Sequence, residues 1–283
     1  MRRKLKKNGW HVCQNVPSCR PYPAEFSPIH TMRYFFEISY NGSGFHGWQN
    51  QDNALGVQEV VEGALSKLLR EEIRVVGSGR TDTGVHCRQQ YFHADIQTPF
   101  ETDTLLQRLN SFLPKSIAIR DIEEVKPDAH ARYDARERSY EYLITRKKNP
   151  LLTDYAYYYF KPLDLAAMNE AAEQLLGEKD FTCFSKVKTD VNHFICKVYR
   201  AKWNQKGDLL VFTISANRFL RGMVRAIIGT LLDVGSGKVS LKEFEGILHG
   251  KDRKKAGMNV PPEGLYLIKV KYPARIFIKR DKK

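Results

Sequence analysis

A glycine-rich stretch with a single acidic residue is the part of the chain best suited to chemistry. It reads Gly77-Ser-Gly-Arg-Thr-Asp-Thr-Gly-Val-His86, with strand-forming residues at 73–76 and 90–96 on either side. Glycine adopts backbone conformations that other residues avoid, so we predict a tight loop at the rim of a sheet that presents Arg80, Thr81 and Asp82. Loops supported in this way often carry functional side chains. The alternative is an Asp that only bonds its own backbone in a turn.

The order of these residues resembles the active-site motif of the tRNA pseudouridine synthase A family, Gly-Arg-Thr-Asp-x-Gly-Val-His. The resemblance implies that Asp82 is the catalytic nucleophile. It also implies that Arg80 occupies the space left by a flipped-out nucleotide and so contacts the substrate. Thr83 and Cys87 stand where the family usually has Ala. Both side chains are small, so we interpret them as tolerated changes.

The reaction implied by this resemblance converts uridine to pseudouridine. The bond from ribose C1′ to uracil N1 breaks, the base turns, and a bond from C1′ to C5 forms, with no oxidation or hydrolysis. Such an isomerase needs one nucleophile and a dry pocket that retains the detached base, so we expect no cofactor and no metal. The predicted loop supplies one carboxylate, and the paired acids of a glycosidase are not evident.

Arginine and tyrosine alternate in a second candidate region, His130-Ala-Arg-Tyr-Asp-Ala-Arg-Glu-Arg-Ser-Tyr-Glu-Tyr142. Alternate residues of a strand share one face, and an aromatic ring beside cations suits a nucleobase next to phosphate. Half-buried sheet tyrosines are an equally good interpretation from strand propensity alone. The segment is similar to the family's His-Ala-Arg…Arg-x-Tyr-x-Tyr pattern. The resemblance assigns Tyr140 to stacking on the target uracil and to proton transfer at C5, and makes His130 and Arg132 candidates for substrate binding.

Hydrophobic periodicity predicts a long helix over 217–234. At about 100° per residue, Arg218, Arg221 and Arg225 would share one narrow face of this helix while an apolar stripe faces the core. A solvated row of charges is the alternative. The segment around Met223-Val-Arg225 resembles the family, in which the matching arginine pairs with the nucleophilic Asp, so we expect Arg225 to be catalytic.

Three further segments bear on the site. The polar run 186–193 is expected to be a loop that contacts RNA through Lys188 and His193, or else a solvated surface loop. Gly42-Ser-Gly-Phe-His-Gly47 matches a dinucleotide-binding fingerprint, but a polar loop follows it instead of a helix, so we reject that reading. The wider segment 40–49 and the segment 256–267 both resemble further motifs of the synthase family.

Composition limits the classes of partner that the protein can bind. The 283 residues carry a formal net charge of +14, which indicates a polyanionic partner such as nucleic acid or an anionic membrane surface. No apolar run approaches the length of a membrane span. Five cysteines without CxxC spacing are typical of a reduced, cytoplasmic protein. The family resemblance points to tRNA as the partner.

Apolar residues at helical spacing predict a helix over 57–69, and a strand is predicted over 117–125. The order of predicted elements indicates an α+β architecture. We divide the chain into an irregular basic extension (1–31), an N-terminal α+β lobe with the Asp82 loop (32–127) and a C-terminal α+β lobe with a basic tail (128–283). The resemblance implies the pseudouridine synthase fold, in which two related lobes with mixed, mainly antiparallel sheets and helices on one face flank an active-site cleft. It also implies a homodimer that acts on positions 38–40 of the tRNA anticodon stem-loop. A non-catalytic basic RNA-binding protein and a synthase of ribosomal RNA are the alternatives, and we expect the extension to be dispensable for catalysis.

Overall fold

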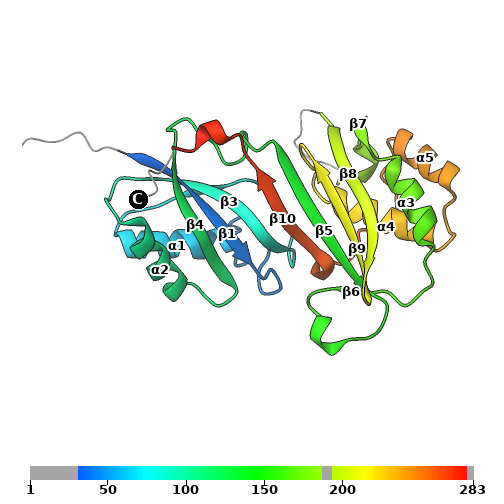
Figure 1. The fold of residues 1–283 in the computed structure, drawn as a ribbon, viewed down its shortest axis with the longest axis horizontal. Helices are drawn as coiled ribbons and strands as arrows, with labels where there is room; N and C mark the ends of the chain where they lie inside the picture. The colour runs from blue at the N-terminus through cyan, green and yellow to red at the C-terminus, as the bar shows by residue number, and fades with distance from the viewer. Residues whose placement is uncertain (1–30, 187–192, 279–283) are drawn as a thin grey trace, which may run out of the picture. The chain divides into compact units, whose positions relative to one another are not determined.

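Residues 31–186 and 193–278 are described by the computed structural model shown in Figure 1. The N-terminal half of this part alternates strands and helices, in the order β1 (Met32–Tyr40), α1 (Val57–Leu69), β2 (Val75–Gly77), β3 (His86–Ile96), α2 (Thr102–Phe112) and β4 (Ile117–Val125). Helix α1 forms because its apolar residues recur at helical spacing, and its buried side chains include Val57, Val61 and Leu65. The predicted bounds of this helix are confirmed.

The C-terminal half begins with β5 (Glu137–Thr145), whose far end leads into the short helix η1 (Pro150–Leu152) and strand β6 (Tyr157–Tyr158). Its remaining regular elements are α3 (Leu165–Glu173), β7 (Gly177–Asp180), η2 (Thr182–Phe184), β8 (Ile195–Lys206), β9 (Leu209–Ala216), α4 (Met223–Gly235), α5 (Leu241–His249), η3 (Pro262–Gly264), β10 (Leu265–Lys271) and η4 (Ala274–Ile276).

One ten-stranded sheet runs through the described residues in the order β4-β1-β3-β10-β5-β9-β8-β7, with β2 on β3 and β6 on β5. Most neighbours are antiparallel, but β10 pairs in parallel with β3 through Tyr266 and Leu267. On its other edge β10 pairs antiparallel with β5, where Leu267 lies opposite Tyr140. The last strand therefore joins the two halves, at the place where the catalytic candidates gather.

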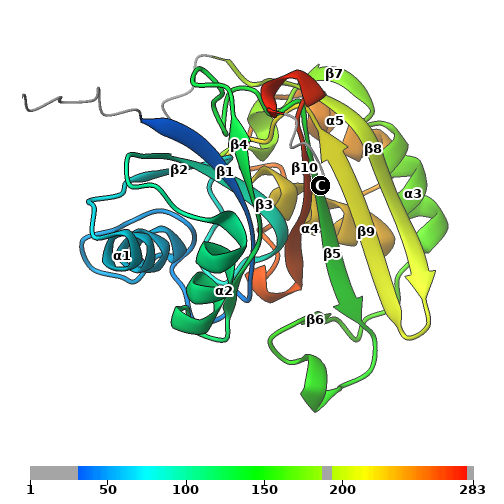
Figure 2. The same cartoon turned by 60° about the vertical axis from the view of Figure 1, so that its left-hand side comes forward.

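The helices cover one face of this sheet. Figures 1 and 2 show α1 and α2 against the β4-β1-β3 part and α3, α4 and α5 against the β5-β9-β8 part. Each group of helices packs over its own apolar cluster. Tyr140 contacts both clusters, so the two clusters lie on the same face of the sheet. A third cluster around Phe35 and Ala131 is separate from both. The mixed α+β sheet with helices on one face is confirmed.

The prediction of one helix over 217–234 is wrong at its start. Helix α4 begins at Met223, because Gly222 has a φ of 73° in the left-handed region and interrupts the helical backbone. The Asn217 side chain accepts hydrogen bonds from the backbone N–H groups of Lys197 and Arg218, which holds the preceding residues in a loop. Of the three predicted arginines, only Arg225 lies on the helix.

Several predictions fall on residues outside those that the structure describes. They concern the predicted extension, of which only Thr31 is described, and the predicted RNA-contacting loop, most of which, including Lys188, is not described. In the described part, no helix combines the length and the apolar character needed to cross a membrane.

Candidate active site

The loop that carries Asp82 is fixed mainly by backbone contacts. The N–H of Ser78 donates to the Tyr91 carbonyl at 2.7 Å, and Gln90 Nε2 donates to the Gly79 carbonyl at 3.1 Å. Beyond the Asp, the N–H of Val85 donates back to the Asp82 carbonyl at 3.1 Å and closes the turn. The Asp82 side chain stays 34% exposed, so it is held on a supported loop and remains open to a substrate.

The segment 40–49 packs directly against this loop. The Tyr40 hydroxyl lies 2.8 Å from the Thr81 hydroxyl, and the Trp48 N–H donates to the Thr81 carbonyl at 3.3 Å. Gly47 has a φ of 86°, and a Cβ atom there would overlap the Thr81 carbonyl oxygen. Gly42 and Gly47 therefore allow close backbone approach to the loop. Thr81 itself is buried, so the prediction that the loop presents this side chain is wrong. Between Met32 and Gly56 the structure describes no helix, which agrees with the rejection of a dinucleotide-binding fingerprint.

Arg225 reaches Asp82 from helix α4. Its Nη1 lies 3.4 Å from Asp82 Oδ2, and its Nε donates to the Val260 carbonyl at 2.7 Å. The Val260 N–H donates back to the Arg225 carbonyl at 3.3 Å, so the segment 256–267 orients the guanidinium. A partly exposed ion pair of this kind adds little to stability, about 0–1 kcal/mol. Its main effect is to hold a cation beside the carboxylate.

Tyr140 lies on β5 and meets Phe219 edge to face, with ring centroids 5.2 Å apart. Burial raises the pKa of the Tyr140 phenol above its ordinary value, the charge of Arg138 acts in the opposite direction, and the charge of Asp82 raises it further. Tyr140 is therefore protonated at neutral pH. The charge of Asp82 raises the pKa of Tyr140 and Arg225 pairs with Asp82, so the three side chains belong to one site built from both halves of the sheet.

Comparison with known proteins gives this arrangement a family. The sequence profile described as tRNA pseudouridine synthase matches residues 38–134 and 171–273. A tRNA pseudouridine synthase A of Bacteroides fragilis is 47% identical over 87% of this chain and 98% of its own length. The proteins of that name from Parabacteroides distasonis and Caldicellulosiruptor bescii are 46% and 43% identical, over 88% and 83% of this chain and 99% and 97% of their own lengths.

The chain belongs to the tRNA pseudouridine synthase A family. This confirms the resemblance seen in the sequence motifs, and with it the prediction of an isomerase. Family membership does not by itself place the remaining candidate residues. Their positions come from the structure.

His130 and Arg132 lie in a turn beside the site. His130 Nδ1 accepts from the N–H groups of Arg132 at 3.1 Å and Tyr133 at 3.4 Å. The carboxylate of Asp134 accepts from the His130 N–H at 2.7 Å. Burial and the charge of Arg33 lower the pKa of His130, so the neutral ring serves as an acceptor that shapes the turn. The Arg132 side chain is exposed.

The other predicted contacts are spread more widely. Arg80 is exposed two residues before Asp82. His193 Nε2 lies 3.2 Å from Arg218 Nη1, at the loop that precedes α4. The structure thus gathers Asp82, Arg225 and Tyr140, and it leaves His193 in a separate basic group with Arg218.

Arg138 lies on β5 with Tyr140, as the alternating pattern predicts, but its contacts were not predicted. Its Nη2 donates to the Ser78 carbonyl at 2.7 Å and to the Arg132 carbonyl at 2.8 Å. Its Nη1 donates to the Asn217 carbonyl at 3.1 Å and the Ala135 carbonyl at 3.5 Å. One guanidinium therefore ties the Asp82 loop to the 130–135 turn and to the loop before α4. Backbone carbonyls far apart in the chain leave no sequence pattern, so only the fold could reveal them.

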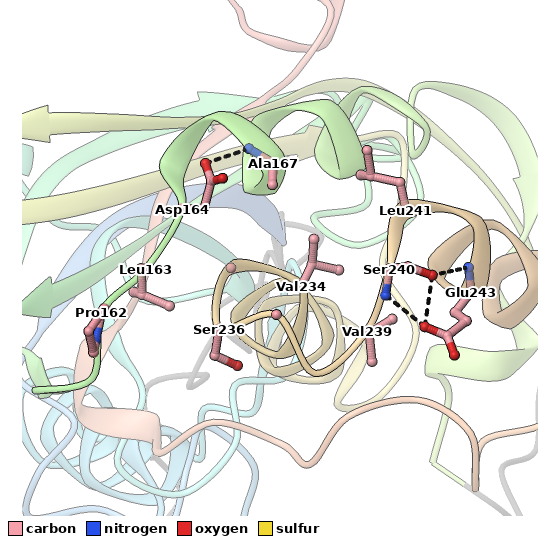
Figure 3. A pocket seen from close by; sticks show the side chains of 12 residues that line it. Pro162, Leu163, Asp164, Ala167, Val234, Ser236, Val239, Ser240, Leu241 and Glu243 are labelled. Carbon is pink, nitrogen blue, oxygen red and sulfur yellow. Dashed lines mark hydrogen bonds between the residues drawn. The ribbon is translucent and has the colours of Figure 1, made fainter.

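A surface hollow of about 740 Å³ lies elsewhere, where the ends of α3, α4 and α5 meet (Figure 3). Asp164 Oδ1 accepts from the Ala167 N–H at 3.0 Å and starts α3. Ser240 and Glu243 form a reciprocal capping box that starts α5. Because these polar groups already serve the helix starts, the hollow is not the active site.

Proposed function

We propose that this protein isomerises uridine to pseudouridine at positions 38–40 of the tRNA anticodon stem-loop, through a covalent intermediate on Asp82. The observation that carries the proposal is the meeting of one exposed carboxylate with a cation and a buried tyrosine. Arg225 Nη1 stands 3.4 Å from Asp82 Oδ2, and the charge of Asp82 raises the pKa of the Tyr140 phenol.

In the proposed first step, the Asp82 carboxylate attacks C1′ of the ribose. The C1′–N1 bond breaks, its electron pair leaves with the uracil, and a bond from C1′ to the Asp82 oxygen forms. The detached uracil anion turns over, C5 attacks C1′, and Asp82 leaves as a carboxylate. Arg225 pairs with the Asp82 carboxylate before the attack and again after its release. Removal of the C2′ proton by Asp82, which would give a glycal, is the alternative route.

The product then needs a proton exchange. After the new bond forms, C5 still carries a hydrogen that must be lost, while N1 must gain one. We assign this exchange to the Tyr140 hydroxyl, whose ring also stacks on the uracil. The pKa of Tyr140 is raised by burial, so in its resting state the phenol has a proton to give, and it becomes a strong base once that proton has left.

The substrate base lies within a stem-loop, so it must leave its stack, at a cost of about a few kcal/mol. Arg80 is exposed beside Asp82, a position that suits a side chain which fills the vacated space. The net charge of +14 supports an RNA partner, and binding should weaken steeply with salt. Cytoplasmic location and a homodimer follow from family resemblance and are part of the proposal.

The test separates catalysis from binding. Asp82→Asn keeps the size of the side chain and removes the nucleophile, so release of tritium from tRNA labelled at uridine C5 should stop. The affinity for tRNA should stay within about threefold, because no positive charge is lost. Equal loss of both would contradict the proposal, and full turnover would favour a non-catalytic role for Asp82. Mapping pseudouridine in cells that lack the protein distinguishes tRNA from ribosomal RNA as the substrate.

A further inference from the structure

We infer that the turn 130–134 forms a platform on which an unpaired base of the RNA substrate stacks, with Tyr133 as its surface. The inference rests on the proposed RNA substrate, but it does not require that catalysis occurs. Neither the motifs nor the comparisons assign a role to Tyr133.

Tyr133 is unusually open for an aromatic residue. Its exposed fraction is 75%, higher than that of Phe160 at 67% and Tyr199 at 47%. A single exposed apolar residue is ordinary on a protein surface, so exposure alone carries no argument. Tyr133 differs in what lies beneath and beside its ring.

The ring is supported from within the turn. The His130 ring lies 4.3 Å from the Tyr133 ring, centroid to centroid, at an angle of 37°. His130 in turn meets the buried His93 ring at 4.8 Å, and His93 Nδ1 accepts from the Ala131 N–H at 3.1 Å. The turn is closed on the other side by the Asp134 N–H, which donates to the His130 carbonyl at 3.0 Å. A surface ring backed in this way loses little freedom when a base stacks on it.

Arginine accompanies this platform. The Arg132 guanidinium lies over the Tyr133 ring, 5.7 Å from its centroid, and Arg136, three residues after Tyr133 in the chain, is exposed. An aromatic ring with arginine is the combination that binds single-stranded nucleic acid, with bases on the ring and phosphates at the cations. A protein partner is the other occupant that an exposed tyrosine could take, and it becomes an outcome of the test below.

The platform is joined rigidly to the catalytic loop. Arg138 Nη2 donates to the carbonyl of Arg132, directly before Tyr133, and to the carbonyl of Ser78, four residues before Asp82. A nucleotide held at Tyr133 would therefore be held at a fixed place relative to Asp82. We infer that this base is a neighbour of the flipped uridine, left unstacked when the target leaves its position.

The experiment measures equilibrium binding of a tRNA transcript, on the Asp82→Asn background so that no turnover alters the RNA. Loss of one base–aromatic stack should weaken binding of Tyr133→Ala by about 5- to 150-fold. Tyr133→Phe retains the ring and should bind within about twofold of the parent. Tyr199 is an exposed tyrosine on β8, next to the edge strand β7. Tyr199→Ala is therefore the matched control and should also bind tRNA within about twofold of the parent.

Two further measurements test whether the loss of binding comes from the aromatic ring. A blunt RNA duplex has no internal unpaired base, so Tyr133→Ala should leave its binding unchanged, and the salt dependence of tRNA binding should keep its slope. Tyr133→Ile retains apolar area without an aromatic face and should bind as weakly as Tyr133→Ala. Because this comparison is independent of folding defects specific to alanine, it decides the case even if Tyr133→Ala is less stable.

The inference is overturned if Tyr133→Ala binds tRNA as the parent does, if it loses tRNA and duplex equally, or if Tyr133→Ile restores binding. Lost affinity for a protein partner or a second copy of the chain, with tRNA binding intact, would identify the turn as a protein contact. None of these results depends on turnover, so a failure of the proposed isomerase activity would be seen separately in the tritium assay.

Discussion

The Asp82 loop and the elements that bring Tyr140 and Arg225 are positioned in different ways. Tyr140 stands on a strand paired on both edges, and Arg225 stands on a helix that is buried along most of its length. The Asp82 loop has no such regular frame, and it depends on contacts with the backbone of segment 40–49 and with the side chains of Gln90 and Arg138.

This difference shows which part of the site geometry is most sensitive to substitution. Regular elements resist small changes because many backbone hydrogen bonds fix them together. The loop is fixed by a few close approaches that only glycine permits, at Gly42 and at Gly47, where φ is also in the left-handed region. The position of the nucleophile therefore depends on residues that have no chemical role of their own.

The largest effect in this comparison is expected from Gly47→Ala. A methyl group at a φ of 86° and against the Thr81 carbonyl must push the loop away, and a displacement of about 1 Å can cost about 100-fold in turnover. We expect that loss in the rate of tritium release, with affinity for tRNA within about threefold of the parent.

Gly44→Ala is the matched control. It lies in the same segment, and a Cβ atom there would meet no atom within 4 Å. Its turnover should equal that of the parent. If the two alanine variants behaved alike, close approach at Gly47 would not be what positions Asp82.

A smaller effect is expected from Arg138→Met, which removes the tie between the loop and the C-terminal half. Turnover should fall about tenfold or more, with tRNA affinity nearly unchanged, because the guanidinium bonds carbonyls rather than solvent-exposed groups. Arg138→Lys should restore only part of the rate, since an ammonium cannot reproduce the planar set of donors.

Arg136→Met provides the comparison for Arg138, because Arg136 is exposed two residues earlier in the chain. It should leave turnover intact and affect only the affinity for RNA. A parallel loss of affinity and turnover in Arg138→Met would show that Arg138 contacts the substrate rather than positioning the loop.

Local patterns predicted much of the fold. Periodicity located α1 at its observed bounds, and β4 was predicted from Ile117 to Val125, after the proline that ends the preceding helix. The Asp82 loop was predicted from glycine spacing, and the family motifs were found in order along the chain. These features depend on residues that are close in the chain, so they can be recognised from the sequence alone.

The features that were missed depend on distant residues or on a neglected local signal. The apolar pattern runs on through Leu220, so periodicity extended α4 across Gly222, which adopts a left-handed φ. The role of β10 as the strand between β3 and β5 is a matter of topology. Helix α5 had a usable signal in the capping box of Ser240 and Glu243. The bonds of Arg138 to backbone carbonyls had none.

The most direct test of the central claim is to find the bond between Asp82 and the ribose. The bond between Asp82 and C1′ exists only after the C1′–N1 bond breaks and before C5 attacks, so a single turnover is stopped with acid at successive times. Nuclease and protease digestion followed by mass spectrometry should then find a ribose phosphate without its base on the peptide that contains Asp82. A reaction that consumes the uridine at the normal rate, with no such addition on that peptide at any quench time, would contradict the covalent mechanism.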